Sequence, residues 1–237
     1  MAGIELRNLN KSYTVDGRIL PVLRDLTLSL ESGAITVLLG KSGCGKTTLL
    51  RLIAGLEMPD SGEIRFGSNS KAAFVFQEPR LMPWLTVRDN IQFGLRRRDI
   101  SPEDTDRIIE TVGLTGFERA YPHQLSGGMQ QRTALARALI CQPSFILMDE
   151  PFAALDHFTR EDMQQALLEI REKTSASILF VTHSIDEALT LGDEIVLLSG
   201  GIAASHYPVS LPHPRSLYAD DIIAIRRQII AGLEHAL

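Results

Sequence analysis

The chain has 237 residues, of which 44% are hydrophobic and 22% are charged, and its formal net charge at pH 7 is −5. This balance is typical of a folded globular protein and excludes disordered, collagen-like and low-complexity chains. Basic residues are scattered along the sequence except for the run Arg96-Arg97-Arg98, which we interpret as a solvated helix end. The negative net charge therefore argues against nucleic acid as a partner.

Membrane insertion and secretion are also disfavoured. The longest aliphatic runs, such as 195–198, are short, whereas a membrane-spanning helix needs about 20 apolar residues. Glu5 and Arg7 stand where a signal peptide would have its apolar segment, so we expect a cytoplasmic protein that does not cross a membrane by itself. Cys44 and Cys141 show no paired CxxC spacing, which predicts free thiols rather than a disulfide or a zinc site.

The first half of the chain predicts strands. Two stretches of alternating apolar and polar residues, separated by the turn signal Asp16-Gly17, predict an antiparallel sheet within the first thirty residues. The apolar run 34–39 is bounded by glycines, as expected of a central strand that is covered on both faces. After a glycine-rich turn we expect a helix over 46–54 and a short strand over 72–76.

From about residue 87 to 140 the sequence predicts mainly helices, one of which begins with Ser101 as N-cap and Pro102 as its first residue. Strands and helices then alternate, which predicts a parallel sheet with covering helices. The tail predicts an extended connection and a final amphipathic helix. The expected strands in this half are 145–148, 177–181 and 195–198, and the expected helices are 156–172 and 184–191.

A phosphate-binding pattern, G-x-x-x-x-G-K-[ST], lies directly after a predicted buried strand and directly before a predicted helix. Its glycines let backbone N–H groups converge on phosphate oxygens, and the helix N-terminus adds partial positive charge. Lys46 is expected to reach the β and γ phosphates, and Thr47 to bind Mg²⁺. The residues of this phosphate loop expected to bind the nucleotide are Gly40, Lys41, Ser42, Gly43, Cys44, Gly45, Lys46, Thr47 and Thr48.

Two acids follow the predicted apolar strand 145–148. They stand at the carboxyl edge of the sheet, where ligands bind in folds of this kind. Asp149 is suited to Mg²⁺, directly or through water, and Glu150 is the candidate base for an attacking water. Taken alone, such a pair is also common at solvated strand ends. Together with the phosphate loop, it predicts a P-loop enzyme that uses or hydrolyses a nucleotide.

The sequence LSGGMQQR at residues 125–132, hereafter the signature segment, closely resembles the signature of the ATP-binding cassette family. Ser126 is expected to cap a helix whose free N–H groups bind phosphate. Gly127 and Gly128 would allow the phosphate to approach these groups closely. In the family the signature of one subunit completes the ATP site of its partner. The resemblance therefore implies a homodimer with ATP and Mg²⁺ as cofactors.

Other residues match the same family in order and type, so the resemblance covers about residues 4 to 205. It implies that Tyr13 stacks on adenine and that Gln77, a catalytic and metal-binding candidate, senses Mg²⁺ and the γ-phosphate. It also implies that His183 contacts the γ-phosphate and positions Glu150 and the attacking water.

Residues 153–156 resemble the D-loop, which implies that Asp156 belongs to the nucleotide site, although alanine stands first where serine is usual. The segment 78–91, which contains Trp84, resembles that of bacterial importers for nitrate, sulfonate and taurine, as does 212–215. In the family the groove beside Trp84 receives a coupling helix of the membrane subunit. A small satellite core is the alternative interpretation of this apolar group.

The resemblance implies an α/β fold with a P-loop NTPase core, a mixed or parallel central sheet, an N-terminal antiparallel β subdomain and an inserted α-helical subdomain. The expected parts are a nucleotide-binding domain over 1–205 and a short tail with a helix over 206–237. Within the domain, we expect a RecA-like core at about 1–86 and 141–205 and a helical subdomain at about 87–140.

The expected function is that of the ATP-hydrolysing subunit of a bacterial importer for a small solute. Its expected partners are two transmembrane permease subunits and, through the complex, a solute-binding protein. Such a subunit would lie peripherally at the cytoplasmic face of the inner membrane. An exporter ATPase remains an alternative, because the catalytic motifs do not encode the direction of transport. A soluble cassette ATPase is a second alternative, although such proteins usually have long coiled-coil insertions or two cassettes in one chain. A P-loop kinase or GTPase would not explain the signature segment or His183.

Overall fold

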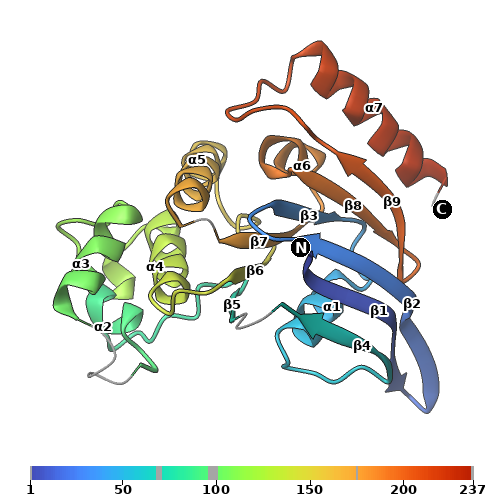
Figure 1. Ribbon diagram of the computed structural model, residues 1–237. Coiled ribbons are helices and arrows are strands. Elements are labelled where there is room, and N and C mark those ends of the chain that lie inside the picture. The colour runs from blue at the N-terminus through green and yellow to red at the C-terminus, as the bar shows by residue number, and fades with distance from the viewer. Residues whose placement is uncertain (1, 68–70, 96–100, 175, 236–237) are drawn as a thin grey trace. The chain divides into compact units, whose positions relative to one another are not determined.

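The computed structural model describes residues 2–67, 71–95, 101–174 and 176–235 (Figure 1). The chain forms two compact units, the first made of Met1–Ser70 with Ala176–Leu237 and the second of Lys71–Ser175. The arginine run that was interpreted as a helix end lies outside the described residues. Among the helices that the structure describes, none has the length and apolar character needed to cross a membrane.

The first unit contains the predicted antiparallel sheet. Its two longest strands are joined at Asp16 and Gly17, whose φ angles of 50° and 74° fit the tight turn that such a hairpin requires. Alternate side chains of these strands, including Leu6 and Leu28, are buried. The strands are β1 (Ala2–Val15), β2 (Arg18–Glu31) and β4 (Ser61–Phe66), in the order β2-β1-β4.

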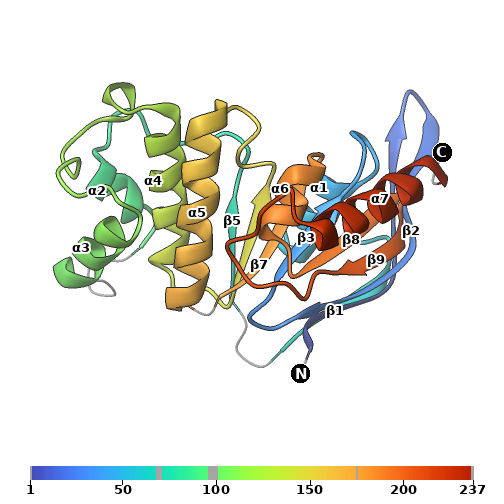
Figure 2. The same cartoon turned by 90° about the horizontal axis from the view of Figure 1, so that it is seen from above.

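A second group of strands in this unit runs in the order β7-β3-β8-β9, with β9 antiparallel to β8 and the others parallel. All five residues of β3 are buried, as the glycine-bounded apolar run predicts. Helix α6 packs on β3 and β7, and α7 packs on β8 and β9 (Figure 2). The elements are β3 (Ile35–Leu39), α1 (Lys46–Ile53), β7 (Ser177–Thr182), α6 (Ile185–Leu191), β8 (Glu194–Ser199), β9 (Ile202–Pro208) and α7 (Asp220–His235).

The connection between β9 and α7 is fixed by a buried arginine. The side chain of Arg215 is only 1% exposed and lies 3.7 Å from a carboxylate oxygen of Asp193. It also donates to the backbone carbonyls of Leu189, Gly192, Val209 and Leu211. The tail is therefore packed against the end of α6 as part of the first unit.

The second unit contains a parallel strand pair and most of the helices. Helix α4 packs against α2, α3, α5 and β5 (Figure 1). Ser101 caps α3 by accepting a hydrogen bond from the backbone N–H of Asp104, which confirms the predicted start of that helix. The elements are β5 (Ala72–Val75), α2 (Val87–Ile91), α3 (Pro102–Thr111), the short 3₁₀ helix η2 (Pro122–Gln124), α4 (Gly127–Leu139), β6 (Phe145–Asp149) and α5 (His157–Thr174).

Candidate functional site

The phosphate loop connects the buried strand β3 to α1. Gly45 has a φ of 106°, and a Cβ atom built on it would lie 2.8 Å from Leu23 Cδ2, so only glycine suits this position. Lys46 is 5% exposed, and its Nζ donates to the carbonyls of Gly40 at 2.7 Å and Lys41 at 3.0 Å. The ammonium group is thus held within the loop, in front of the N-terminus of α1.

His183 emerges at the same sheet edge as this loop, because the parallel strands β3 and β7 are in register at Leu39 and Thr182. The next residues along the two strands are Gly40 and His183. The histidine side chain is exposed at this edge. The first unit therefore places the phosphate loop and His183 on neighbouring strand ends.

Buried polar groups fix the turn at His183. The hydroxyl of Thr182 donates to the carboxylate of Glu187 and accepts from the N–H of Ser184 at 3.0 Å. Thr182 is 2% exposed and Glu187 is 6% exposed. Ser184 in turn caps α6 by accepting from the N–H of Glu187 at 3.3 Å. The residues on either side of His183 are therefore bonded to each other and to α6.

Tyr13 also belongs to the first unit, on β1 opposite Leu20 of β2. Its hydroxyl donates to the carboxylate of Glu57 and interacts with the side chain of Thr48 on α1. Partial burial, together with the hydrogen bond to Glu57, raises the pKa of the Tyr13 phenol above its usual value. The predicted adenine-binding tyrosine is thus connected to the helix that follows the phosphate loop.

In the second unit, Gln77, Asp149 and Glu150 lie at one strand edge. Strands β5 and β6 are parallel, and Val75 pairs with Met148. Gln77 stands two residues after Val75 and Glu150 two residues after Met148, so both follow the same end of the strand pair. Glu150 has a φ of 43°, which is uncommon for a residue with a side chain. Such strained backbone is concentrated at functional sites, which agrees with the role predicted for Glu150.

The signature segment begins α4. Ser126 is the N-cap, and its hydroxyl accepts from the N–H of Met129 at 3.3 Å. Ser126 and Gly127 are exposed, whereas Gly128 is buried. A Cβ atom on Gly128 would lie 2.4 Å from Thr159 Cγ2, so this glycine allows α4 to pack against α5. The predicted capping is confirmed, and the second glycine has a packing role in addition to the role expected of it.

Asp156 is the cap of α5 in this structure. Its two carboxylate oxygens accept from the N–H of Thr159 at 3.1 Å and from the Thr159 hydroxyl at 2.6 Å. The hydrogen bond from the Thr159 side chain, followed by the one from its backbone, lowers the pKa of Asp156. The predicted helix over 156–172 therefore begins one residue later, at His157. A contact of Asp156 with the nucleotide stays a prediction.

Three residues that sequence reasoning did not find connect the elements of this unit. Thr159 contacts both Asp156 and the position of Gly128. Gln131 donates to the carbonyl of Phe76 at 3.4 Å, and Arg137 donates to the carbonyls of Arg80 and Pro79. These bonds attach α4 to the segment that carries Gln77. No spacing pattern in the sequence marks the bonds of Gln131 and Arg137, because these side chains bind backbone atoms 55 or more residues away.

Each unit contains candidate ligands for Mg²⁺: Thr47 in the first, and Gln77 and Asp149 in the second. Their hydroxyl, amide and carboxylate oxygens are ligands that suit this hard cation, which usually keeps several waters and binds substrate phosphates as well. Among the described residues no group of three or more histidine, cysteine, aspartate or glutamate side chains could hold a metal alone. The chemistry of each of these donors thus suits Mg²⁺.

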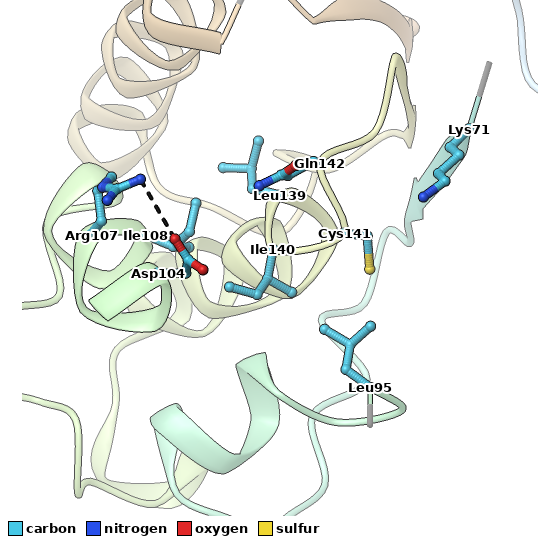
Figure 3. A pocket seen from close by; sticks show the side chains of 9 residues that line it. All are labelled: Lys71, Leu95, Asp104, Arg107, Ile108, Leu139, Ile140, Cys141 and Gln142. Carbon is cyan, nitrogen blue, oxygen red and sulfur yellow. Dashed lines mark ion pairs between the residues drawn. The ribbon is translucent and has the colours of Figure 1, made fainter. Parts of the chain in front are cut away.

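A cavity of about 390 Å³ lies elsewhere in the second unit (Figure 3). It contains none of the predicted site residues, and within it Asp104 and Arg107 form an ion pair at 3.6 Å. We therefore assign it no part in nucleotide chemistry. Its lining residues are Lys71, Leu95, Asp104, Arg107, Ile108, Leu139, Ile140, Cys141 and Gln142.

Comparison with known proteins decides the family. Residues 23–153 match the family model described as ABC transporter. The chain belongs to the ABC transporter family. The match confirms the resemblance seen in the signature segment.

Two similar family members are aliphatic sulfonates import ATP-binding proteins. The one from Bacillus subtilis (strain 168) is 42% identical over 94% of this chain and 91% of its own length. The one from Pseudomonas savastanoi pv. phaseolicola (strain 1448A / Race 6) is 46% identical over 91% of each chain. Among solved structures, the chain is similar to a dimeric ATP-binding cassette in a post-hydrolysis state bound to ADP and Pi. The two structures superpose with a TM-score of 0.76 and share 31% sequence identity, and the match covers 88% of this chain and 100% of that chain. The predicted α/β fold of an ABC ATPase is thereby confirmed.

The turn at His183 yields a stability test. Thr182→Val keeps the side chain's size but removes the hydroxyl that donates to Glu187 and accepts from Ser184. We expect a loss of about 1–3 kcal/mol in the free energy of unfolding, because buried polar groups lose a partner. Thr182→Ser retains the hydroxyl and should recover most of this loss. Urea unfolding followed by circular dichroism measures both variants, and a Val variant as stable as the natural chain would contradict the assignment.

Proposed function

We propose that this chain is the ATP-binding and ATP-hydrolysing subunit of a bacterial ABC importer for a small solute of the nitrate, sulfonate or taurine class. The single observation that carries the activity is the phosphate loop, in which Lys46 is buried in front of the N-terminus of α1. The class of solute is supported by the aliphatic sulfonates import proteins, which match this chain over nearly its whole length.

In the proposed site, the N–H groups of the phosphate loop and Lys46 bind the β and γ phosphates, and Tyr13 stacks on adenine. The N-terminus of α1 adds a favourable interaction with the negative phosphates. Thr47, Gln77 and Asp149 would hold Mg²⁺, which neutralises charge that develops on the phosphate oxygens. The nucleotide is thus bound at both ends by residues that the sequence predicts.

In the proposed hydrolysis, Glu150 orients the attacking water and accepts its proton, while His183 contacts the γ-phosphate. Positioning matters more than an unusual pKa for such a base, because phosphoryl transfer depends mainly on alignment and electrostatic stabilisation. The turn fixed by Thr182 and Glu187 supports this role of His183, since it limits where the imidazole lies.

The signature segment supports a homodimer. The exposed residues Ser126 and Gly127 are the N-cap and the first residue of α4, a helix of 13 residues. The free N–H groups at this N-terminus would form a second binding place for phosphate. One nucleotide does not require two such places within one chain. We therefore propose a head-to-tail dimer in which each phosphate loop binds ATP together with the signature segment of the partner. ATP binding closes this dimer and hydrolysis reopens it.

An exposed apolar surface in the second unit supports a membrane partner. Trp84 is 69% exposed, and Phe117 and Tyr121 are also exposed. Fully buried Asn90 shapes the loop of Trp84 by bonding to the backbone of Met82, Leu85 and Thr86. Backbone bonds from Val87 to Ala120 and from Arg88 to Glu118 place the segment 117–121 beside this loop.

We propose that this surface receives a coupling helix from each of two transmembrane permease subunits. Exposed aromatic side chains on a loop held by buried hydrogen bonds are typical of a binding surface. In such a complex a solute-binding protein delivers the solute, and the chain lies peripherally at the cytoplasmic face of the inner membrane. The dimer would thereby convert ATP binding and hydrolysis into movement of its membrane partners.

The catalytic role of Glu150 is tested by Glu150→Gln, which keeps the size of the side chain but removes the base. We expect ATP turnover to fall by about 100-fold or more, while ATP binding is retained and the ATP-bound dimer accumulates. Phosphate release and light scattering measure the two effects. Undiminished hydrolysis would remove Glu150 from the proposed role.

The coupling surface is tested by Trp84→Ala in cells that contain the natural membrane subunits. Loss of a large aromatic contact should reduce solute uptake by about tenfold, whereas ATPase activity of the isolated protein should change little. Tyr218→Ala is a matched control, because this aromatic residue is 90% exposed but lies in the tail. Uptake equal to that of the control would contradict the coupling surface.

A further inference from the structure

The hydroxyl of Tyr13 has a specific acceptor. It donates to Oε2 of Glu57, which lies 44 residues further along the chain. A carboxylate accepts hydrogen bonds strongly, so it orients the phenol more firmly than water would. Partial burial and the bond to Glu57 raise the pKa of the Tyr13 phenol, which favours the protonated form that donates this bond. The tyrosine ring is therefore oriented at its hydroxyl end as well as at the backbone.

Glu57 is itself attached to α1. Its second carboxylate oxygen, Oε1, lies 3.3 Å from NH1 of Arg51 in the last turn of that helix. The backbone N–H groups of Leu56 and Glu57 both donate to the carbonyl of Arg51, at 2.9 and 3.4 Å. Helix α1 begins at Lys46, directly after the phosphate loop. Glu57 therefore connects the ring of Tyr13 to the helix whose N-terminus faces the phosphates.

One face of the Tyr13 ring already has a cationic neighbour. Lys11 Nζ lies 5.5 Å from the ring centroid. This ammonium is fixed by the carbonyl of Met58 at 2.8 Å and by a carboxylate oxygen of Asp60 at 3.4 Å. The other oxygen of Asp60 accepts from the N–H of Ser12 at 2.6 Å. A base stacked on this ring would therefore take the face opposite Lys11.

We infer that Glu57 is a positioning residue for adenine recognition: by holding the Tyr13 hydroxyl against α1, it sets the distance between the stacked base and the phosphate loop. The inference rests on the proposed function, in which Tyr13 stacks on adenine. It explains why a tyrosine serves here, since phenylalanine could stack but could not bond to Glu57. Glu57 acts through Tyr13 and has no part in the bond that breaks.

The inference predicts a change in substrate affinity without a change in chemistry. Glu57→Ala and Tyr13→Phe should each raise the KM for MgATP about three- to tenfold, because each removes a hydrogen bond that includes a charged group. The kcat of each variant should stay within about twofold of the natural value, since the catalytic groups are untouched. Steady-state ATPase assays measure both constants. Glu57→Gln keeps an acceptor oxygen and should raise the KM less.

Two further measurements separate positioning from general structural support. The double variant Tyr13→Phe with Glu57→Ala should be no worse than either single variant, because both remove the same bond. Inorganic tripolyphosphate, which has no base, should inhibit the Glu57→Ala variant as strongly as the natural protein. Glu63→Ala is the matched control, since this exposed glutamate of the first unit pairs only with Arg65 among the interactions described for it.

Several outcomes would overturn the inference. These are an unchanged KM in Glu57→Ala, a further rise in KM when Glu57→Ala is added to Tyr13→Phe, or a parallel loss of tripolyphosphate binding. Failure of the proposed function would look different. In that case the natural protein would not hydrolyse ATP, or Tyr13→Ala would leave the KM unchanged. A raised KM in Tyr13→Ala with an unchanged KM in Glu57→Ala would reject only the role of Glu57.

Discussion

Backbone hydrogen bonds between parallel strands align Leu39 of β3 with Thr182 of β7, and Val75 of β5 with Met148 of β6. Because parallel strands end at the same edge, the residues that follow them emerge together. In the first unit this constraint places the phosphate loop beside His183. In the second it places Gln77 beside Asp149 and Glu150. A shift of register in either pair would separate the groups that the proposed chemistry requires.

Two helix N-termini supply positive charge without ionised side chains. Helix α1 begins at the phosphate loop, and α4 begins at the signature segment with Ser126 as its cap. Each N-terminus carries partial positive charge and free N–H groups, which favour a bound phosphate. The chain thus has two helix N-termini of the kind that favours phosphate, and we propose a dimer because one nucleotide does not require both of them within one chain. Thr159, which bonds to Asp156 and packs at Gly128, joins the D-loop to the second of these ends.

Local patterns in the sequence predicted the elements that carry the site. Apolar runs, glycine boundaries and cap residues predicted strands and helices whose ends differ by at most one residue from those of α1, β6 and α6. The order of the motifs predicted the family, which the comparisons confirm. Each of these signals lies within a few neighbouring residues.

Long-range polar contacts could not be predicted in the same way. Glu57 bonds to Tyr13, Gln131 to the backbone of Phe76, and Arg137 to that of Pro79, across 44 to 58 residues. Backbone carbonyls carry no residue identity, so the sequence does not show which of them a side chain will bind. The capping role of Asp156 was missed for a different reason, since a family motif suggested a ligand contact where a local cap also fits.

The central claim is that each ATP site needs the phosphate loop of one copy and the signature segment of another. Lys46→Met disables the loop, whereas Ser126→Asp keeps a good helix cap but adds a negative charge where phosphate would bind. ATPase activity should be measured for each variant alone and for the two after mixing. We predict that neither is active alone and that the mixture recovers up to about a quarter of the natural rate, because about half of the dimers are mixed and each has one intact site. A mixture no more active than the sum of its parts would contradict the account.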